Sequence, residues 1–228
     1  MCERGTDAGI RAMDFQIYTM YVNRQDLLEH AIESVGRYRD RVVVIDNSPE
    51  RRLELEHFRG EIIRPPVPLF VSQSYNLIRS FAEERRQEGF FMMHSDAEAS
   101  EDVVEQLLER AKELDRTRVN WGVILTNYDV FCLLNTRIVK EFPWDTYLPV
   151  YYTDVDFYYR LRLAGVRLVE TDLPVKHMEQ GSNAMKADPT LRQFITSNYP
   201  AWRQYYIAKW GGERDQERYS TPFNRRLL

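Results

Sequence analysis

The feature that most constrains the fold is an alternation, from residue 14 onward, between short runs rich in β-branched or aromatic residues and longer amphipathic stretches. Such alternation is typical of strands that alternate with helices and assemble into a mostly parallel sheet. Strands are predicted at residues 15–21, 41–46, 62–63, 90–94, 119–125, 130–134 and 166–170. The sequence therefore predicts an α/β fold with helices flanking a mostly parallel sheet.

Helices are predicted between these strands. The first carries Leu27, Leu28, Ala31, Ile32 and Val35 on one face, as an amphipathic helix packed on a sheet would. A second helix is predicted over residues 74–88 and ends at Gly89, and a third begins after an N-cap at Ser100. A fourth is predicted over residues 154–164, with Thr153 as its N-cap and Gly165 at its end. A fifth is predicted over residues 200–210 and ends at Gly211-Gly212. Residues 178–199 are predicted to be irregular.

The length of 228 residues suits one domain with a substantial core. We expect residues 1–13 to be a disordered N-terminal extension and residues 14–212 to form the domain. The charged residues 213–228 are expected to form a tail or lid.

Charge and cysteine content limit which binding partners and which cellular compartment are expected. The net charge of −4 gives no general attraction to nucleic acid or to an anionic membrane. No apolar stretch resembles a secretory signal or approaches the roughly 20 residues that span a bilayer. The two cysteines, Cys2 and Cys132, form no metal-ligand spacing and suit a reducing compartment. The predicted location is cytoplasmic.

Polar residues follow several predicted strands, and ligands of open α/β sheets bind beyond the carboxyl ends of the strands. We predict nucleotide contacts at Thr19, Tyr21, Asp46, Asn76 and Asp96. Asp46 would accept a hydrogen bond from an N–H group of the base, and the Tyr21 ring would cover the face of the base. As alternatives, Asp46 belongs to a simple turn and Asn76 is a solvated helix residue.

Asp96 and Glu98 are two residues apart, so in an extended segment both carboxylates would point to one side. Oxygen ligands of this kind suit Mg²⁺ or Mn²⁺ held against a diphosphate. His177 follows a strand and is a candidate third ligand. The alternatives are that the two acids only face the dipole of the next helix and that His177 is structural. No glycine-rich phosphate loop is present, so a metal would have to neutralise the phosphates.

Asp154 and Asp156 open a predicted helix directly after a loop rich in aromatic residues and proline. Acidic residues favour a first helical turn, which explains them without any function. The preceding loop is typical of a substrate-facing wall, and Asp154 is a candidate general base for deprotonating an acceptor hydroxyl. Trp144, Tyr152 and Asp156 are candidate acceptor-binding or sugar-binding residues.

Taken together, residues 14–181 resemble the family 2 glycosyltransferases with the GT-A fold, and Lys209-Trp210-Gly211-Gly212 with Thr221-Pro222-Phe223-Asn224 is similar to the ends of some compact bacterial and viral members. The resemblance rests on Thr19 and Tyr21, Asp46, Asn76, Asp96-Ala97-Glu98, and Thr153-Asp154-Val155-Asp156 leading to Gly165. It implies a Rossmann-like nucleotide-binding sheet, Asp154 as catalytic base, and Asp96, Glu98 and His177 at the metal. The sequence departs from the family pattern at Glu98, where Asp is usual, and at Thr153, where Glu is frequent.

These observations predict an inverting, metal-dependent hexosyl- or deoxyhexosyltransferase with Mn²⁺ or Mg²⁺ as cofactor. Its donor is expected to be a UDP- or dTDP-sugar, and its acceptor a glycan or another hydroxyl-bearing molecule. One alternative is a sugar-1-phosphate nucleotidylyltransferase, although residues 20–23 lack the Gly-rich, basic loop of those enzymes. A second alternative is a noncatalytic module of the same fold that binds a glycan or a partner protein.

Overall fold

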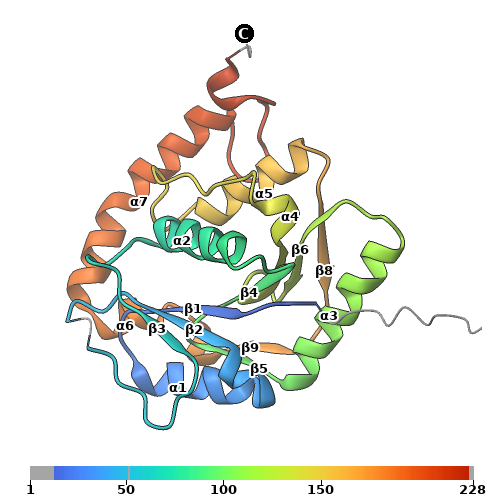
Figure 1. The fold of residues 1–228 in the computed structure, drawn as a ribbon. Coiled ribbons are helices and arrows are strands. Elements are labelled where there is room, and N and C mark those ends of the chain that lie inside the picture. Colours follow the sequence, from blue (N-terminus) through green and yellow to red (C-terminus); the bar gives the residue numbers. More distant parts are fainter. Residues whose placement is uncertain (1–12, 51, 226–228) are drawn as a thin grey trace, which may run out of the picture.

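The computed structural model describes residues 13–50 and 52–225, so all but the last residue of the expected N-terminal extension lies outside the described residues. A seven-stranded sheet forms the centre, in the order β3-β2-β1-β4-β7-β6-β8 (Figure 1). Its strands are β1 (Ile17–Tyr21), β2 (Val42–Asp46), β3 (Glu61–Ile63), β4 (Gly89–Met93), β6 (Trp121–Thr126), β7 (Phe131–Asn135) and β8 (Arg167–Thr171). Strand β7 runs antiparallel to both neighbours and the other pairs are parallel, which confirms the predicted mostly parallel sheet.

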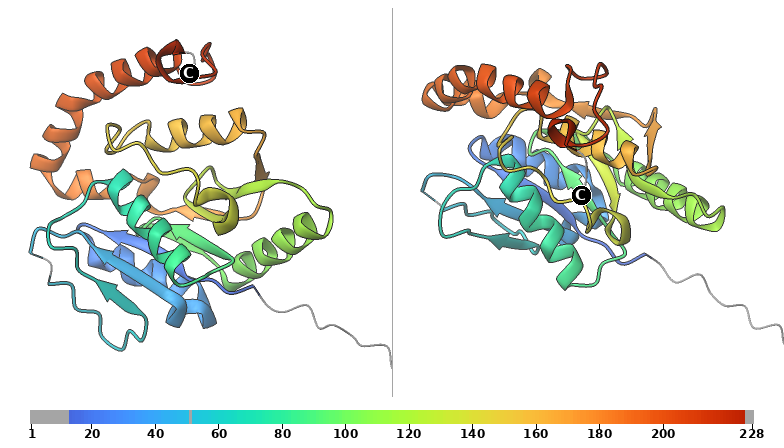
Figure 2. Two further views of the ribbon diagram at one scale, coloured as in Figure 1. Left: turned by 45° about the horizontal axis from the view of Figure 1, so that its top comes forward. Right: turned by 90° about the horizontal axis from the view of Figure 1, so that it is seen from above.

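Helices cover both faces of this sheet (Figures 1 and 2). Helices α1 (Gln25–Ser34) and α3 (Glu101–Arg116) pack on one face, and α2 (Val71–Glu84), α4 (Thr136–Val139) and α5 (Thr153–Leu163) pack on the other. Each face of the sheet and its helices enclose one hydrophobic core. Side chains along β2 alternate between the two cores: Val42 and Val44 face α1, while Val43 and Ile45 face α2.

A second, two-stranded sheet was not predicted. Strand β5 (Ala97–Ala99) pairs antiparallel with β9 (Val175–His177), with Ala97 opposite His177 and Glu98 opposite Lys176. Three-residue strands carry too little alternation to be recognised from sequence. The pairing brings the segment after β4 next to a segment about 80 residues further along the chain.

Two helix ends differ from the prediction. Helix α2 ends at Glu84, and Gly89 is the first residue of β4 and not a helix terminus. At α5 the N-cap is Tyr152, in the left-handed conformation with φ 64° and ψ −1°, and Thr153 is already helical. The Thr153 hydroxyl is buried without a hydrogen-bond partner among the described residues, so it does not cap the helix. Gly165 follows α5 with φ 70°, as a helix-ending glycine should.

The segment predicted to be irregular is largely helical. It contains the short turn η2 (Met178–Gln180), helix α6 (Asn183–Ala187) and helix α7 (Pro189–Trp210), which continues through Pro200. Asp188 caps α7 by accepting from the backbone N–H groups of Thr190 and Leu191. Arg24 holds this segment against α1 through an ion pair of 2.9 Å with Glu179.

Residues 213–225 of the expected tail pack against α5 and α7. The backbone N–H of Tyr219 donates to the Trp210 carbonyl at 3.0 Å, and the Tyr159 hydroxyl donates to the Tyr219 carbonyl at 2.8 Å. The Arg214 guanidinium lies 4.8 Å from the centre of the Tyr128 ring. A lid role for these residues stays a prediction.

Within the described residues, every helix is too short or too polar to cross a lipid bilayer.

Candidate functional site

A pocket of about 440 Å³ opens at the edge of the sheet where β1 and β4 end. Its walls come from the start of α1, the loop before α2, the turn between β6 and β7, the start of α5, and helices α6 and α7. Much of the wall is apolar. We call the part lined by His94, Ser95, Asp96, Asp129, Thr153, Asp154, His177, Ser182 and Asn183 the polar end; the other polar residues of the lining are Asn23, Arg24, Tyr75 and Tyr151.

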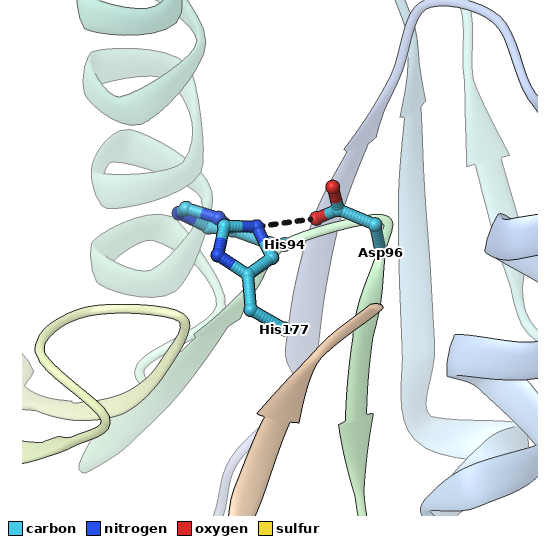
Figure 3. A group of neighbouring side chains, drawn as sticks. All are labelled: His94, Asp96 and His177. Carbon is cyan, nitrogen blue, oxygen red and sulfur yellow. Dashed lines mark hydrogen bonds and ion pairs between the residues drawn. The ribbon is translucent and has the colours of Figure 1, made fainter. Parts of the chain in front are cut away.

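His94, Asp96 and His177 form a compact group at this polar end (Figure 3). Their ligand atoms all lie within 4.8 Å of one another. The Nε2 atom of His177 lies 3.0 Å from Asp96 Oδ1, and the Asn183 amide donates to Asp96 Oδ2 at 2.8 Å. His94 and Asp96 follow β4, and the β5–β9 pairing places His177 beside them. The predicted proximity of Asp96 and His177 is confirmed, whereas His94 was not predicted.

Burial and contacts within this group shift the pKa of each of its members, and they shift the two histidines in opposite directions. Burial opposes ionisation of Asp96, yet hydrogen bonds from His177 and Asn183 and the two imidazoles leave its pKa below the usual value. The hydrogen bond to Asp96 raises the pKa of His177, and burial lowers the pKa of His94. His94 is therefore neutral at neutral pH, as a metal-binding imidazole must be.

Glu98 does not belong to this group. Its carboxylate accepts from Lys176 Nζ at 3.1 Å and lies 3.2 Å from His30 Nε2. Residues 95–96 form a turn, so the segment is not extended at Asp96 and the condition for a shared orientation is not met. Asp96 and Glu98 have separate partners and do not form one group. The two-residue spacing that was assigned to Asp96 and Glu98 belongs to His94 and Asp96, directly after β4.

Asp154 lies in the first turn of α5 and lines the same pocket. Its Oδ2 atom accepts a hydrogen bond of 2.6 Å from the hydroxyl of Tyr128, which comes from the β6–β7 turn. Asp154 thus lines one cavity with Asp96 and His177, and its role as a base stays a prediction.

Asp129 is a pocket residue to which the sequence analysis gave no role. It is 9% exposed, and its Oδ1 atom lies 4.0 Å from His94 Nε2. Burial and the nearby carboxylate of Asp154 raise the pKa of Asp129 well above that of an ordinary aspartate. The turn that carries it holds Asn127 and Tyr128 at φ 40° and 63°, a conformation that costs free energy for residues other than glycine. Strained backbone beside buried acids is common at functional sites.

The residues predicted to contact the nucleotide at the first two strands do not line the pocket. Asp46 is fully buried, and its carboxylate accepts from the Ser48 backbone and hydroxyl and from the Leu53 backbone. It orders the loop after β2 and does not line the pocket. Thr19 is buried within β1, and Tyr21 packs against the core beneath α1. The end of β1 reaches the pocket through Met20 and through residues 22–24.

Asn76 and Trp144 hold each other in place. The Asn76 amide donates to the Trp144 carbonyl and accepts from the Trp144 N–H, both at 2.8 Å. The Trp144 ring is 3% exposed and stacks on Phe157 with ring centres 4.1 Å apart. The expected nucleotide contact at Asn76 and sugar contact at Trp144 are replaced by one structural clamp that fixes the loop before α5.

Asp156 is likewise structural and not a sugar contact. It is fully buried and bonds Arg160 Nε and Trp210 Nε1, each at 2.8 Å, and Lys209 Nζ at 2.6 Å. These bonds join α5 to the end of α7. Tyr152 packs beside them, with its hydroxyl 3.3 Å from that of Tyr199, and its neighbour Tyr151 lines the pocket instead.

No family model and no curated protein matches the sequence. Solved structures resemble the fold at low identity. Residues 1–349 of S. aureus TarS match with a TM-score of 0.54 and 14% identity, over 70% of this chain and 58% of that one. A mannosyltransferase from Pyrobaculum calidifontis, in complex with GDP-Man and Mn²⁺, matches with a TM-score of 0.55 and 14% identity, over 72% of this chain and 56% of that one. The chain thus spans a little more than half of residues 1–349 of TarS and of the mannosyltransferase, and 35% of the longer solved TarS chain.

A cytidylyltransferase from Leptospira borgpetersenii matches with a TM-score of 0.52 and 9% identity, over 91% of this chain and 99% of that one. Together these likenesses define the fold as that of the GT-A-like nucleotide-diphospho-sugar transferases. Both glycosyltransferases and nucleotidylyltransferases share this fold.

Proposed function

We propose that the chain is an inverting, metal-dependent glycosyltransferase of the family 2 type that uses a nucleotide diphosphate sugar. The observation that carries the proposal is that one pocket holds both a cation site, made by His94, Asp96 and His177, and the separate carboxylate of Asp154. TarS has been solved with UDP-GlcNAc, and the mannosyltransferase with GDP-Man and Mn²⁺, which supports a donor of this class. A UDP- or dTDP-sugar is the expected donor.

In this reaction Asp154 accepts the proton of the acceptor hydroxyl. The hydroxyl oxygen forms a bond to the anomeric carbon while the bond from that carbon to the phosphate oxygen breaks, and the electron pair leaves with the diphosphate. His94, Asp96 and His177 would hold a divalent cation such as Mn²⁺ or Mg²⁺, which would supply positive charge for the departing diphosphate. The hydrogen bond from Tyr128 fixes one oxygen of Asp154 and leaves the other for the acceptor.

The charges of the pocket support the need for a cation. Arg24 is the only lysine or arginine among the described residues that line it, and its guanidinium is held by Asp26 and Glu179. Asp96, Asp129 and Asp154 add carboxylates. A diphosphate would be repelled here unless an ion offset these charges.

Nucleotidylyl transfer is the second candidate, because the cytidylyltransferase match extends over most of both chains. That reaction requires a triphosphate, which carries more negative charge than a diphosphate sugar. The one arginine that lines the pocket is already paired with two carboxylates, so the pocket suits a triphosphate less well than a diphosphate sugar. Release of pyrophosphate from a nucleoside triphosphate and a sugar phosphate would favour this candidate.

The proposal is tested first by a thermal-shift panel of nucleotide diphosphates and nucleotide sugars, each with Mn²⁺ and with EDTA. Selective binding stabilises the folded protein by mass action, so a metal-dependent rise in melting temperature is expected for one nucleotide class. The donor found in this way is then used in a transfer and hydrolysis assay.

Asp154→Asn is expected to retain donor binding and to lose about 10²- to 10⁴-fold in transfer, the usual contribution of a general base. Asp102→Asn is the matched control, since Asp102 lies in the first turn of α3, is exposed, and is absent from the pocket. Full activity of Asp154→Asn would remove Asp154 as the base. Absence of any metal-dependent nucleotide binding would favour a noncatalytic module.

A further inference from the structure

We propose that the mouth of the pocket carries an acceptor subsite formed by four aromatic rings, and that its ligand is a neutral oligosaccharide of two or more sugar units. The rings belong to Phe70, Tyr151, Phe194 and Tyr199, and we call them the aromatic rim. Use of the bound oligosaccharide as acceptor rests on the proposed function, whereas its binding at the rim does not.

The four rings come together from three segments of the chain. Phe70 directly precedes α2 and Tyr151 precedes α5, and both residues line the pocket. Each of them meets a ring from α7. Phe194 stacks on Phe70 with ring centres 5.8 Å apart, and Tyr199 meets Tyr151 edge-on with ring centres 5.3 Å apart. The rim therefore begins in the pocket and continues onto α7.

Helix α7 carries its two rings on either side of a stripe that lines the pocket. Leu191 and Ile195 form this stripe. Because successive helical residues are about 100° apart, Phe194 and Tyr199 flank it. All four rings of the rim are between 37% and 43% exposed, so each keeps a surface open to solvent. Contiguous exposed apolar surface beside a pocket is typical of a binding site.

The chemistry of the rim suits a sugar chain. One face of a pyranose ring carries C–H groups that pack on the electron-rich face of an aromatic ring, and the hydroxyls around its edge stay free for hydrogen bonds. Such hydroxyls have partners here, because the Tyr199 hydroxyl lies 3.3 Å from that of Tyr152 beside the rings. A lipid chain would remove water from these hydroxyls without replacing its hydrogen bonds.

The charge of the pocket favours a neutral chain. Tyr151 stands directly before the N-cap of α5 and Asp154 lies in the first turn of that helix, and both line the pocket. An acceptor with one hydroxyl at Asp154 therefore leaves the pocket past Tyr151. A phosphate or carboxylate group on its terminal unit would be repelled by Asp154 and by Asp129, which also lines the pocket.

The test is isothermal titration of the full-length protein, without donor, with cello-, malto- and chito-oligosaccharides of one to four units. In at least one series we expect the affinity to rise at least about tenfold from the monosaccharide to the trisaccharide, because added units reach further rings of the rim. Equal affinities along every series, or no binding of any member at millimolar concentration, would overturn the proposal.

Two other occupants of the rim are outcomes of the same experiments. Tighter binding of octyl glucoside than of every trisaccharide would show that the rings hold an alkyl chain, and would overturn the proposal. Analytical ultracentrifugation of the unmodified protein and of Phe194→Leu reports a second copy. A dimer that this substitution dissociates would assign the rim to contact between two copies, and would also overturn the proposal.

Phe194→Leu and Tyr199→Leu each remove a ring but keep an apolar side chain. Both are expected to weaken trisaccharide binding at least about fivefold, because a leucine offers no flat face to the sugar. Phe223→Leu is the matched control, since Phe223 is 40% exposed, as Phe194 is, and lies outside the rim and the pocket lining. Unchanged trisaccharide affinity in both folded rim variants would overturn the proposal.

Transfer assays separate this proposal from the proposed function. With the donor found in the thermal-shift panel, the rim variants should raise the KM for a trisaccharide acceptor more than they lower kcat. A protein that binds trisaccharides at the rim but transfers no sugar would reject the proposed function and leave the rim as an oligosaccharide-binding site. Transfer to a monosaccharide as efficient as to every trisaccharide would support the proposed function and overturn the acceptor subsite.

Discussion

The hydroxyl of Tyr128 donates to Asp154 Oδ2 at 2.6 Å, and this bond joins the strained β6–β7 turn to the first turn of α5. Tyr128 is held in place from two sides. The Tyr158 ring meets it edge-on with ring centres 6.0 Å apart, and the Arg214 guanidinium lies over its face. Tyr128 is therefore a positioning residue for the proposed base.

Tyr128→Phe removes this bond and keeps the ring. We expect kcat for transfer to fall about 10- to 150-fold, because a net hydrogen bond to a charged group contributes about 1.5–3 kcal/mol, while the KM for donor stays unchanged. Steady-state kinetics with the donor identified above provide the measurement. Tyr147→Phe is the control, since Tyr147 is 76% exposed. An unaltered kcat would show that Asp154 does not depend on Tyr128.

Gly181→Ala tests the support of His177. A Cβ atom at Gly181 would lie 2.4 Å from His177 Cε1, so the ring must move, and we expect at least about tenfold weaker binding of Mn²⁺. Gly165→Ala is a closely matched control, because Gly165 has the same φ of +70° but a Cβ atom there meets nothing within 4 Å. Both variants place alanine at a positive φ, and Gly181 also has ψ −172°, a combination adopted almost only by glycine, so unfolding free energies are measured beside the metal affinities. Equal metal affinity in the two would contradict the role given to Gly181.

Asp156→Asn tests whether that residue is structural. Its carboxylate is fully buried among Arg160, Lys209 and Trp210, and breaking a buried ion pair costs about 3–5 kcal/mol. We expect a loss of that order in the free energy of unfolding in urea, with donor affinity of the folded protein unchanged. Asp172→Asn, at an exposed position, should change stability by less than about 0.5 kcal/mol. A stable Asp156→Asn with impaired sugar binding would restore its predicted sugar contact.

Asp145 gives a pH dependence with a definite sign. Burial raises its pKa, but the hydrogen bonds from Lys209, the Tyr147 backbone N–H and the Tyr205 hydroxyl, together with the charge of Lys209, outweigh this effect and leave the pKa below that of a free aspartate. The stabilisation is therefore complete above the unfolded value of about 3.9 and is lost as the pH falls through the folded value. We expect Asp145→Asn to lower the free energy of unfolding at pH 7 and to show a shallower loss below pH 4 than the unmodified protein. Parallel curves for the two proteins would contradict this assignment.

The sequence was informative wherever a local pattern determined the structure. The continuous apolar runs of β2 and β4, the amphipathic face of α1 and the cap at Ser100 are all present as predicted. Helix α7 was underestimated, because Pro200 is typical of a first helical turn and yet lies in the helix interior here. The N–H missing at proline costs less where packing of Ile195 and Trp202 holds the helix on both sides.

The candidate site was predicted only in part, because the sequence shows where polar residues stand but not which atoms they contact. Asp96, Asp154 and His177 follow or precede regular elements, and the topology brings those ends together. Asp46 and Asn76 occupy equally suggestive positions, but loops of their own chain use their hydrogen-bonding atoms. Sequence spacing shows which polar residues stand at strand ends. It does not show which of them already have a partner.

The β5–β9 pairing gives the ion a second consequence, for folding. Asp96 and His177 are separated by 81 positions, so an ion bound by both acts as a cross-link that closes a long loop. Closing such a loop reduces the conformational entropy of any state that keeps the ion. Metal binding should therefore oppose separation of the segment around His177 from the segment around Asp96. In the metal-free protein, residues 172–183 should be the first to become accessible to proteases.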